Sequence, residues 1–170
     1  MLFTWKKTLL FVAGTTLLLV AIDWLILSDI LPIEKTIDYS ALQANFIQAW
    51  IKLAVVIGLL LPIIALFVWW RYLEPRKVLG FYLVVLIVQI AAEMILSRVL
   101  FPSLVVMSGT IYTAFRIWQL WQGQQLVKAG VQIHSESPTV FNNLLWLLLL
   151  FWSSNLIVLF VVSWPTILFD

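Results

Sequence analysis

The sequence predicts an all-α fold, a single bundle of transmembrane helices formed by the whole chain, residues 1–170. Three observations predict it. Hydrophobic residues make up 64% of the chain, charged residues make up only 11%, and most of the apolar residues fall into continuous runs. A soluble domain has about 25% charged residues, so this chain is too poor in charge to coat a globular surface. An ordinary soluble enzyme and a disordered chain are therefore excluded.

Four apolar runs are long enough to cross a membrane as helices, which takes roughly 20 residues for about 30 Å of hydrocarbon. They predict helices at about 8–28, 48–71, 78–99 and 140–163. Lys6 and Lys7 precede the first run, as they would in a signal peptide. No small-residue cleavage site closes that run, so we expect it to remain as an uncleaved span.

A fifth run, residues 104–122, is ambiguous because it contains Ser108, Thr113 and Arg116. The distribution of charge favours a crossing here. With five spans and the N-terminus inside, seven basic residues lie on or near the inner side and three on the outer side. With four spans the split is five against five, whereas membrane proteins concentrate Lys and Arg inside. We therefore predict five helices, with four as the alternative.

Tryptophans and prolines mark the limits of these spans. Nine of the ten tryptophans fall near a predicted membrane interface, and only Trp152 falls at mid-depth. A tight turn is expected at Phe101-Pro102-Ser103, since proline stops a helix. Pro62 is expected to kink the second helix. That helix is expected to start before the membrane, with Asp38 or Ser40 as its N-cap.

Polar side chains inside the predicted spans are the candidates for function, because an unpaired charge in a membrane is costly. The candidates for ligand binding or ion coupling are Asp23, Gln89, Glu93, Arg98, Arg116 and Asn155. All except Arg116 are expected, together with Lys52, in one layer of the outer half of the membrane. Gln89, Glu93 and Ser97 share one helix face.

This layer has two interpretations. It could form a polar pocket open to the outer side, in which Glu93 carries a proton or binds a cation. Alternatively, its charges form interhelical ion pairs, such as Asp23 with Lys52, or Glu93 with Arg98 of a neighbouring chain. The second interpretation is the more conservative, since charged side chains near helix ends also extend to the interface.

Arg116 belongs to a separate polar face that also holds Gly109 and Thr113. The small residues would let a neighbouring helix approach closely. Arg116 itself is expected either to reach the inner-leaflet headgroups or to bind a lipid phosphate or another anion from the inner side. His134, in a polar inner loop, is an exposed histidine without an assigned role.

The sequence does not support an enzyme. Cysteine is absent and there is one histidine, so disulfides, thiol chemistry and a multi-histidine metal or haem site within the chain are excluded. There is no GxSxG, Walker, GxGxxG or HExxH motif. No metal ligand is assigned.

One spacing resembles that of a known family. Glu93 and Arg98 are separated like the glutamate and arginine of single-helix chlorophyll-binding proteins of the light-harvesting type. Leu96 occupies the position where that pattern has Asn or His, so the second ligand is missing and no family is assigned. Pigment binding remains an alternative, because Glu, Gln or Asn can ligate a magnesium macrocycle and 15% of the residues are aromatic.

These observations predict a small accessory or assembly subunit of a larger membrane complex. One alternative is an oligomeric carrier or channel for a small solute, proton or cation that uses Glu93. Another is a membrane protein that binds a lipid or a pigment; of these cofactors, lipid is expected and pigment is the alternative. The expected partners are membrane lipids and other membrane proteins or further copies of the chain, and no nucleic acid, since the net charge is only +2. A bacterial inner membrane and a thylakoid-like membrane both fit.

Overall fold

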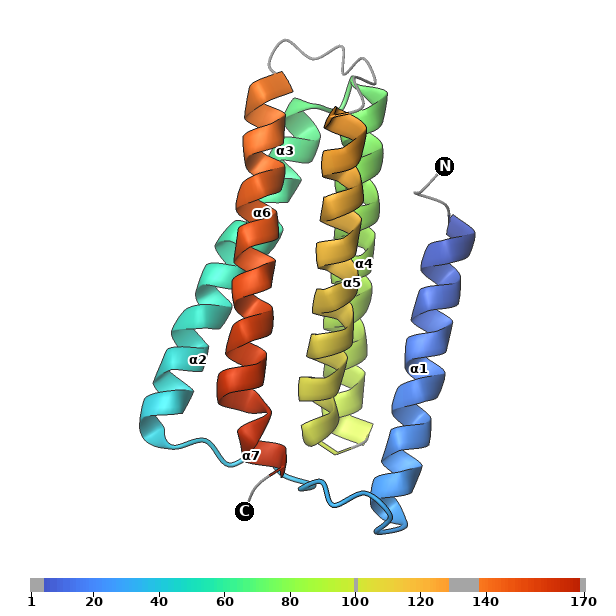
Figure 1. Ribbon diagram of the computed structural model, residues 1–170, viewed down its shortest axis with the longest axis vertical. Coiled ribbons are helices and arrows are strands. Elements are labelled where there is room, and N and C mark those ends of the chain that lie inside the picture. The colour runs from blue at the N-terminus through green and yellow to red at the C-terminus, as the bar shows by residue number, and fades with distance from the viewer. Residues whose placement is uncertain (1–4, 100, 129–137, 169–170) are drawn as a thin grey trace.

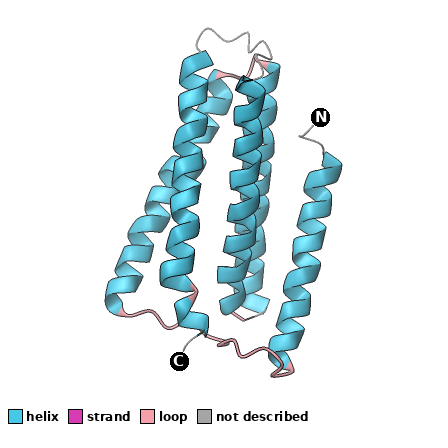
Figure 2. Cartoon of the chain, viewed as in Figure 1, coloured by secondary structure: helices cyan, strands magenta, loops and turns pink. Residues whose placement is uncertain are grey.

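The computed structural model describes residues 5–99, 101–128 and 138–168, and within them every regular element is a helix. The helices stand side by side as long rods (Figures 1 and 2). Their bounds are α1 Trp5–Leu27, α2 Ala41–Leu53, η1 Ala54–Leu60, α3 Leu61–Val68, α4 Leu73–Val99, α5 Ser103–Lys128, α6 Pro138–Val158, η2 Leu159–Ser163 and α7 Pro165–Leu168. The segments α2–η1–α3 and α6–η2–α7 are each nearly continuous. The predicted all-α bundle is therefore confirmed.

Four of the rods are long and apolar enough to cross a membrane: Lys6–Leu27, Ala41–Val68, Leu73–Ile95 and Thr139–Leu168. This arrangement is compatible with a multi-pass membrane protein. The fifth rod, α5, has 26 residues and is about 39 Å long at 1.5 Å per residue. It packs against α4, α6 and α1. Its polar side chains face these neighbours, which explains why its sequence is less apolar than a lipid-exposed helix would be.

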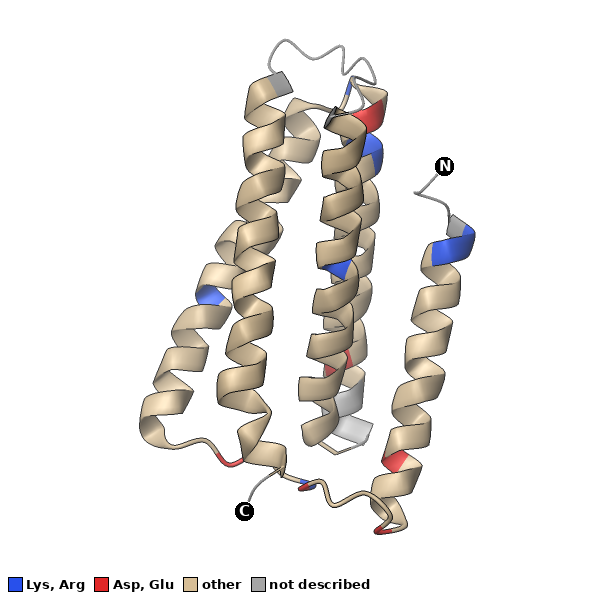
Figure 3. Cartoon of the chain, in the orientation of Figure 1, with Lys and Arg blue, Asp and Glu red and all other residues tan. Residues whose placement is uncertain are grey.

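The two ends of the bundle differ in charge (Figure 3). At the end where α1 and α4 begin, here called the basic end, lie Lys6, Lys7, Arg71, Arg76 and Lys77, together with Glu74. At the opposite, acidic end, the segment of residues 28–40 carries Asp29, Glu34 and Asp38 and one cation, Lys35. α1 begins at the basic end and α7 lies at the acidic end (Figure 1).

The segment between α1 and α2 is held against the acidic end of the bundle. Asp29 has a left-handed backbone (φ 53°), and the N–H of Ile30 bonds to the carbonyl of Leu25 at 3.0 Å, a Schellman ending for α1. Further along, the N–H of Glu34 bonds to the carbonyl of Ile167 in α7 at 3.0 Å. Backbone contacts thus connect this segment to the other end of the chain.

Ser40 is the N-cap of α2, as one of the two predicted alternatives. Its side chain accepts a hydrogen bond from the N–H of Gln43, and the Gln43 side chain accepts one from the N–H of Ser40. This reciprocal pair is a capping box, which satisfies donors that the first helical turn leaves free. The predicted turn between α4 and α5 is also present, with Pro102 between the two helices.

Pro62 changes the helix that contains it. The π-helical turn η1 lies directly before it, and the N–H of Leu61 bonds to the carbonyl of Val56, five residues back. Proline has no N–H for the carbonyl four residues before it, which here belongs to Gly58. The hydroxyl of Tyr82 in α4 donates to that carbonyl at 2.6 Å. Where the sequence predicts a kink at Pro62, the structure has a π-helical turn before the proline, and the backbone of this turn is hydrogen-bonded to α4.

Gly58 also sets how closely η1 approaches α6. A Cβ atom at this position would lie 2.7 Å from Cζ2 of the buried Trp152 ring, a distance that forces a shift. We expect Gly58→Ala to lower the free energy of unfolding by about 1–3 kcal/mol through overpacking. The measurement is thermal unfolding in mild detergent, followed by circular dichroism.

Gly80→Ala is the matched control, because a Cβ at Gly80 in α4 would meet nothing within 4 Å. Alanine is the better helix former by up to about 1 kcal/mol, so this variant should keep or raise the melting temperature. Equal melting temperatures for the two variants would contradict the close packing of Gly58 on Trp152.

Candidate functional site

Arg116 lies in the centre of the bundle with 0% of its surface exposed. The prediction that this side chain reaches the inner-leaflet headgroups is therefore wrong, whereas the binding of an anion stays a prediction. The physical reason is the position of α5, which other helices cover on several sides. The polar helix face of Arg116 was expected to meet a neighbouring helix. In the structure, Gly109, Thr113 and Arg116 all face neighbouring helices.

The guanidinium of Arg116 is held by α4 and α6. One terminal nitrogen donates a hydrogen bond to Oε1 of Gln89 in α4. The guanidinium carbon lies 3.9 Å from the ring centroid of Trp152 in α6 and 5.8 Å from that of Tyr82 in α4. A cation over an aromatic face is stabilised by about 2 kcal/mol or more where water is excluded. Within the described residues, Nε and the other terminal nitrogen have no hydrogen-bond partner.

Gln89 connects this cation to Glu93. Its amide nitrogen donates to Oε1 of Glu93 at 2.6 Å, one helical turn along α4. Its oxygen accepts the hydrogen bond from Arg116, so a single side chain bridges a guanidinium and a carboxylate. Gly109 of α5 faces this carboxylate, since a Cβ there would lie 3.6 Å from Oε1 of Glu93, an ordinary contact distance.

One interpretation of the sequence paired Glu93 with Arg98 of a neighbouring chain. The side chain of Arg98 lies outside the described side chains, so this pairing stays a prediction. Within the chain, Glu93 accepts a hydrogen bond from Gln89. The shared helix face of Gln89 and Glu93 was predicted, and their hydrogen bond is consistent with it.

Asn155 of α6 forms a second polar link in the same region. Its oxygen accepts from the indole N–H of Trp50 in α2 at 2.7 Å, and its nitrogen donates to the hydroxyl of Thr113 in α5 at 3.1 Å. Close to it, the indole of Trp152 donates to the hydroxyl of Tyr82 at 2.8 Å. Polar contacts therefore join α2, α4, α5 and α6.

The part played by the aromatic residues was not predicted. Trp50 and Trp164 were expected near an interface, and in the structure both indoles donate to side chains of other helices, Trp50 to Asn155 and Trp164 to Thr110 at 2.9 Å. Two signals were available. Trp152 was the one tryptophan at mid-depth, and Tyr82 is a tyrosine inside an apolar span, where a hydroxyl needs a partner.

A cavity of about 410 Å³ opens beside these polar groups. Residues of α2, η1, α4, α5, α6 and η2 line it, and most of them are apolar. Gln89, Glu93 and Asn155 supply polar groups to its wall. Ile37 and Tyr39 also line it, so the cavity extends to the segment at the acidic end. Three of the six predicted site residues are thus brought together, with Arg116 directly behind them.

Asp23 and Lys52 do not belong to this site. They lie on α1 and α2, which stand on opposite sides of the bundle, so they cannot form the ion pair that one interpretation proposed (Figure 1). Asp23 is buried, and its Oδ1 has no hydrogen-bond partner among the described residues. Lys52 is exposed.

Comparison with known proteins gives no family for this arrangement: no family model, no curated protein and no solved structure matches the chain. Within the described residues, no group of three or more His, Asp or Glu side chains could hold a metal ion.

The bridge through Gln89 can be tested by removing it. Gln89→Leu deprives Arg116 of its acceptor and Glu93 of its donor, so we expect a loss of about 1.5–3 kcal/mol in the free energy of unfolding. The melting temperature in detergent measures this loss.

Gln119→Leu applies the same change to another buried glutamine, one whose Oε1 has no hydrogen-bond partner in the described part of the chain. Removing an unsatisfied polar group costs little, so its melting temperature should stay near that of the parent protein. If Gln89→Leu were as stable as Gln119→Leu, the bridge would not hold the bundle together.

Proposed function

We propose that this protein is a small integral membrane protein that binds a lipid-like amphiphile in the cavity between its helices. The observation that carries the proposal is the composition of the cavity wall, which is apolar except for a few groups clustered around Glu93 and Asn155. Its volume of about 410 Å³ falls within the range of about 300–1,000 Å³ typical of ligand pockets. A bacterial inner membrane or a thylakoid-like membrane would each supply such molecules.

The polar wall specifies the chemistry of the ligand's head. Glu93 is linked through Gln89 to the guanidinium of Arg116, which balances its negative charge. A carboxylate accepts hydrogen bonds and donates none, so the complementary group is a hydroxyl, an amine or an amide N–H. The apolar side chains around it suit a hydrocarbon or ring body. In the pigment alternative, a macrocycle occupies the same cavity and Glu93 ligates its magnesium.

The proposal predicts that filling the cavity expels the ligand. Val55 and Val56 are neighbours on η1 with similar exposure, 44% and 54%, but only Val55 lines the cavity. We expect Val55→Trp to lose the amphiphile that co-purifies with the parent protein, and Val56→Trp to keep it. Mass spectrometry of the extracted small molecules and an absorption spectrum measure retention.

Glu93→Gln tests the head group separately. Losing a hydrogen bond to a charged group costs about 1.5–3 kcal/mol, so retention should fall tenfold or more. A parent protein that carries only bulk lipid would refute the proposal. Proton or cation flux in liposomes that Glu93→Gln abolishes would favour the carrier instead.

An accessory role in a larger complex is the second candidate, and Lys52 is the observation that favours it. This lysine is exposed on a helix long and apolar enough to span a membrane, and among the described residues it forms no ion pair. A charged side chain facing lipid costs about 2.5–3.5 kcal/mol at the membrane centre, a cost that an acidic residue of another subunit would offset.

Lys52→Leu therefore should detach that subunit when the protein is purified from its native membrane under mild detergent. Leu53→Ala, at the next exposed position, leaves the charge in place and serves as the control. A strictly monomeric parent protein, or an unchanged set of co-purifying proteins in Lys52→Leu, would eliminate this role for Lys52.

A further inference from the structure

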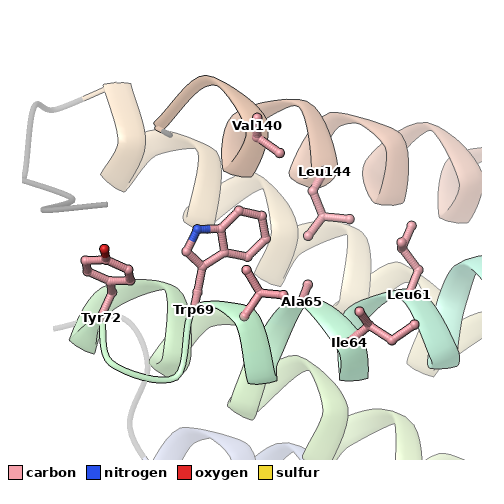
Figure 4. Close-up of a pocket in the computed structure, with 8 residues that line it drawn as sticks. Leu61, Ile64, Ala65, Trp69, Tyr72, Val140 and Leu144 are labelled. Carbon is pink, nitrogen blue, oxygen red and sulfur yellow. The ribbon is translucent and has the colours of Figure 1, made fainter. Parts of the chain in front are cut away.

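A second hollow lies between α3 and α6, near the basic end of the bundle (Figure 4). It measures about 480 Å³ and shares no lining residue with the cavity beside Glu93. Leu61, Ile64 and Tyr72 line it from α3 and the turn that follows, and Val140 and Leu144 line it from α6. We call it the α3–α6 groove.

The groove changes in polarity along its length. Leu61 and Ile64 lie toward one end, and Trp69 and Tyr72 lie toward the other, where the nitrogen of the indole and the oxygen of the phenol are found (Figure 4). From Leu61 to Trp69 the chain rises about 12 Å at 1.5 Å per residue. This is most of the depth of one leaflet, since the hydrocarbon core is roughly 30 Å thick. An acyl chain would fit this apolar length.

Positive charge borders the polar end of the groove. Arg71 directly precedes Tyr72, is exposed, and forms no ion pair within the described part of the chain. Arg76 is also exposed; its guanidinium carbon lies 5.7 Å from the ring centroid of Trp70, and it donates to the carbonyl of that residue at 3.5 Å. Among the described residues, the acid nearest in sequence to these arginines is Glu74, which is paired with Lys77 at 3.2 Å.

We propose that the α3–α6 groove binds an anionic phospholipid from the leaflet at the basic end. One acyl chain occupies the apolar length of the groove, and the phosphate lies near Arg71 and the hydroxyl of Tyr72. Charge complementarity selects this occupant, because a zwitterionic lipid offers the same chains but no net negative charge to the arginines. The groove is independent of the proposed cavity ligand, so each proposal stands or fails alone.

The test measures lipid binding to delipidated protein in detergent by native mass spectrometry. The probes are phosphatidylglycerol and phosphatidylcholine with identical acyl chains. We expect the parent protein to prefer phosphatidylglycerol by roughly fivefold for each basic side chain engaged. Equal binding of the two lipids would overturn the proposal.

Two pairs of variants locate the site. Ile64 and Phe67 are both exposed on α3, at 60% and 71%, but only Ile64 lines the groove. Ile64→Trp should abolish the preference and Phe67→Trp should retain it. Arg71→Gln should reduce the preference, whereas Lys7→Gln removes one charge at the same end on α1 and should leave it unchanged.

Three other outcomes would overturn the proposal. A loss of preference in Lys7→Gln as large as in Arg71→Gln would mean that the basic end attracts anionic lipids without a defined site. If inorganic phosphate, added as a competitor, displaced phosphatidylglycerol completely, the acyl chain would contribute nothing to binding. Unchanged preference in Ile64→Trp would exclude the groove. The circular dichroism spectrum of each variant establishes that it is folded.

Discussion

A buried guanidinium is the constraint on which the arrangement of the helices depends. Arg116 lies on the central helix α5 without exposed surface, and an uncompensated charge in such a place costs several kcal/mol. Its neighbours supply what water would otherwise provide: Gln89 accepts a hydrogen bond, and Trp152 presents the face of its ring. Gln89 lies on α4 and Trp152 lies on α6. The contacts that Arg116 requires therefore specify how α4, α5 and α6 are aligned along their lengths.

Pro62 extends this network to a fourth helix, the one that contains η1 and α3. Pro62 has no N–H to offer the carbonyl of Gly58, so that carbonyl is free to accept from a side-chain donor. Tyr82 donates to that carbonyl and accepts from Trp152. The Trp152 ring that contacts Arg116 is therefore held in place by Tyr82. The hydroxyl of Tyr82 is itself bonded to the carbonyl of Gly58, four residues before Pro62. Pro165 follows a second π-helical turn, η2, at the acidic end.

The polar network also determines the character of the cavity. Glu93 is positioned by Gln89, and Asn155 is positioned by Trp50 and Thr113, so the polar wall is held in place by protein contacts. A preorganised wall binds a ligand without first paying the entropy of ordering its side chains. The same contacts that hold the helices together thus shape the place where we propose that a ligand binds.

The sequence by itself determined the helical fold, the approximate positions of the long rods and the turn at Pro102, because these depend on apolar run length and on local hydrogen bonding. It reduced the N-cap of α2 to two alternatives, Asp38 and Ser40, and the structure decided for Ser40. It also indicated that Gln89 and Glu93 share a helix face, which follows from helical periodicity alone. Only the tertiary structure decided that α5 is the central helix. Hydropathy cannot tell a polar side chain that faces lipid headgroups from one that faces another helix, so the burial of Arg116 could not be predicted, nor could its contact with a tryptophan 36 positions further along the chain.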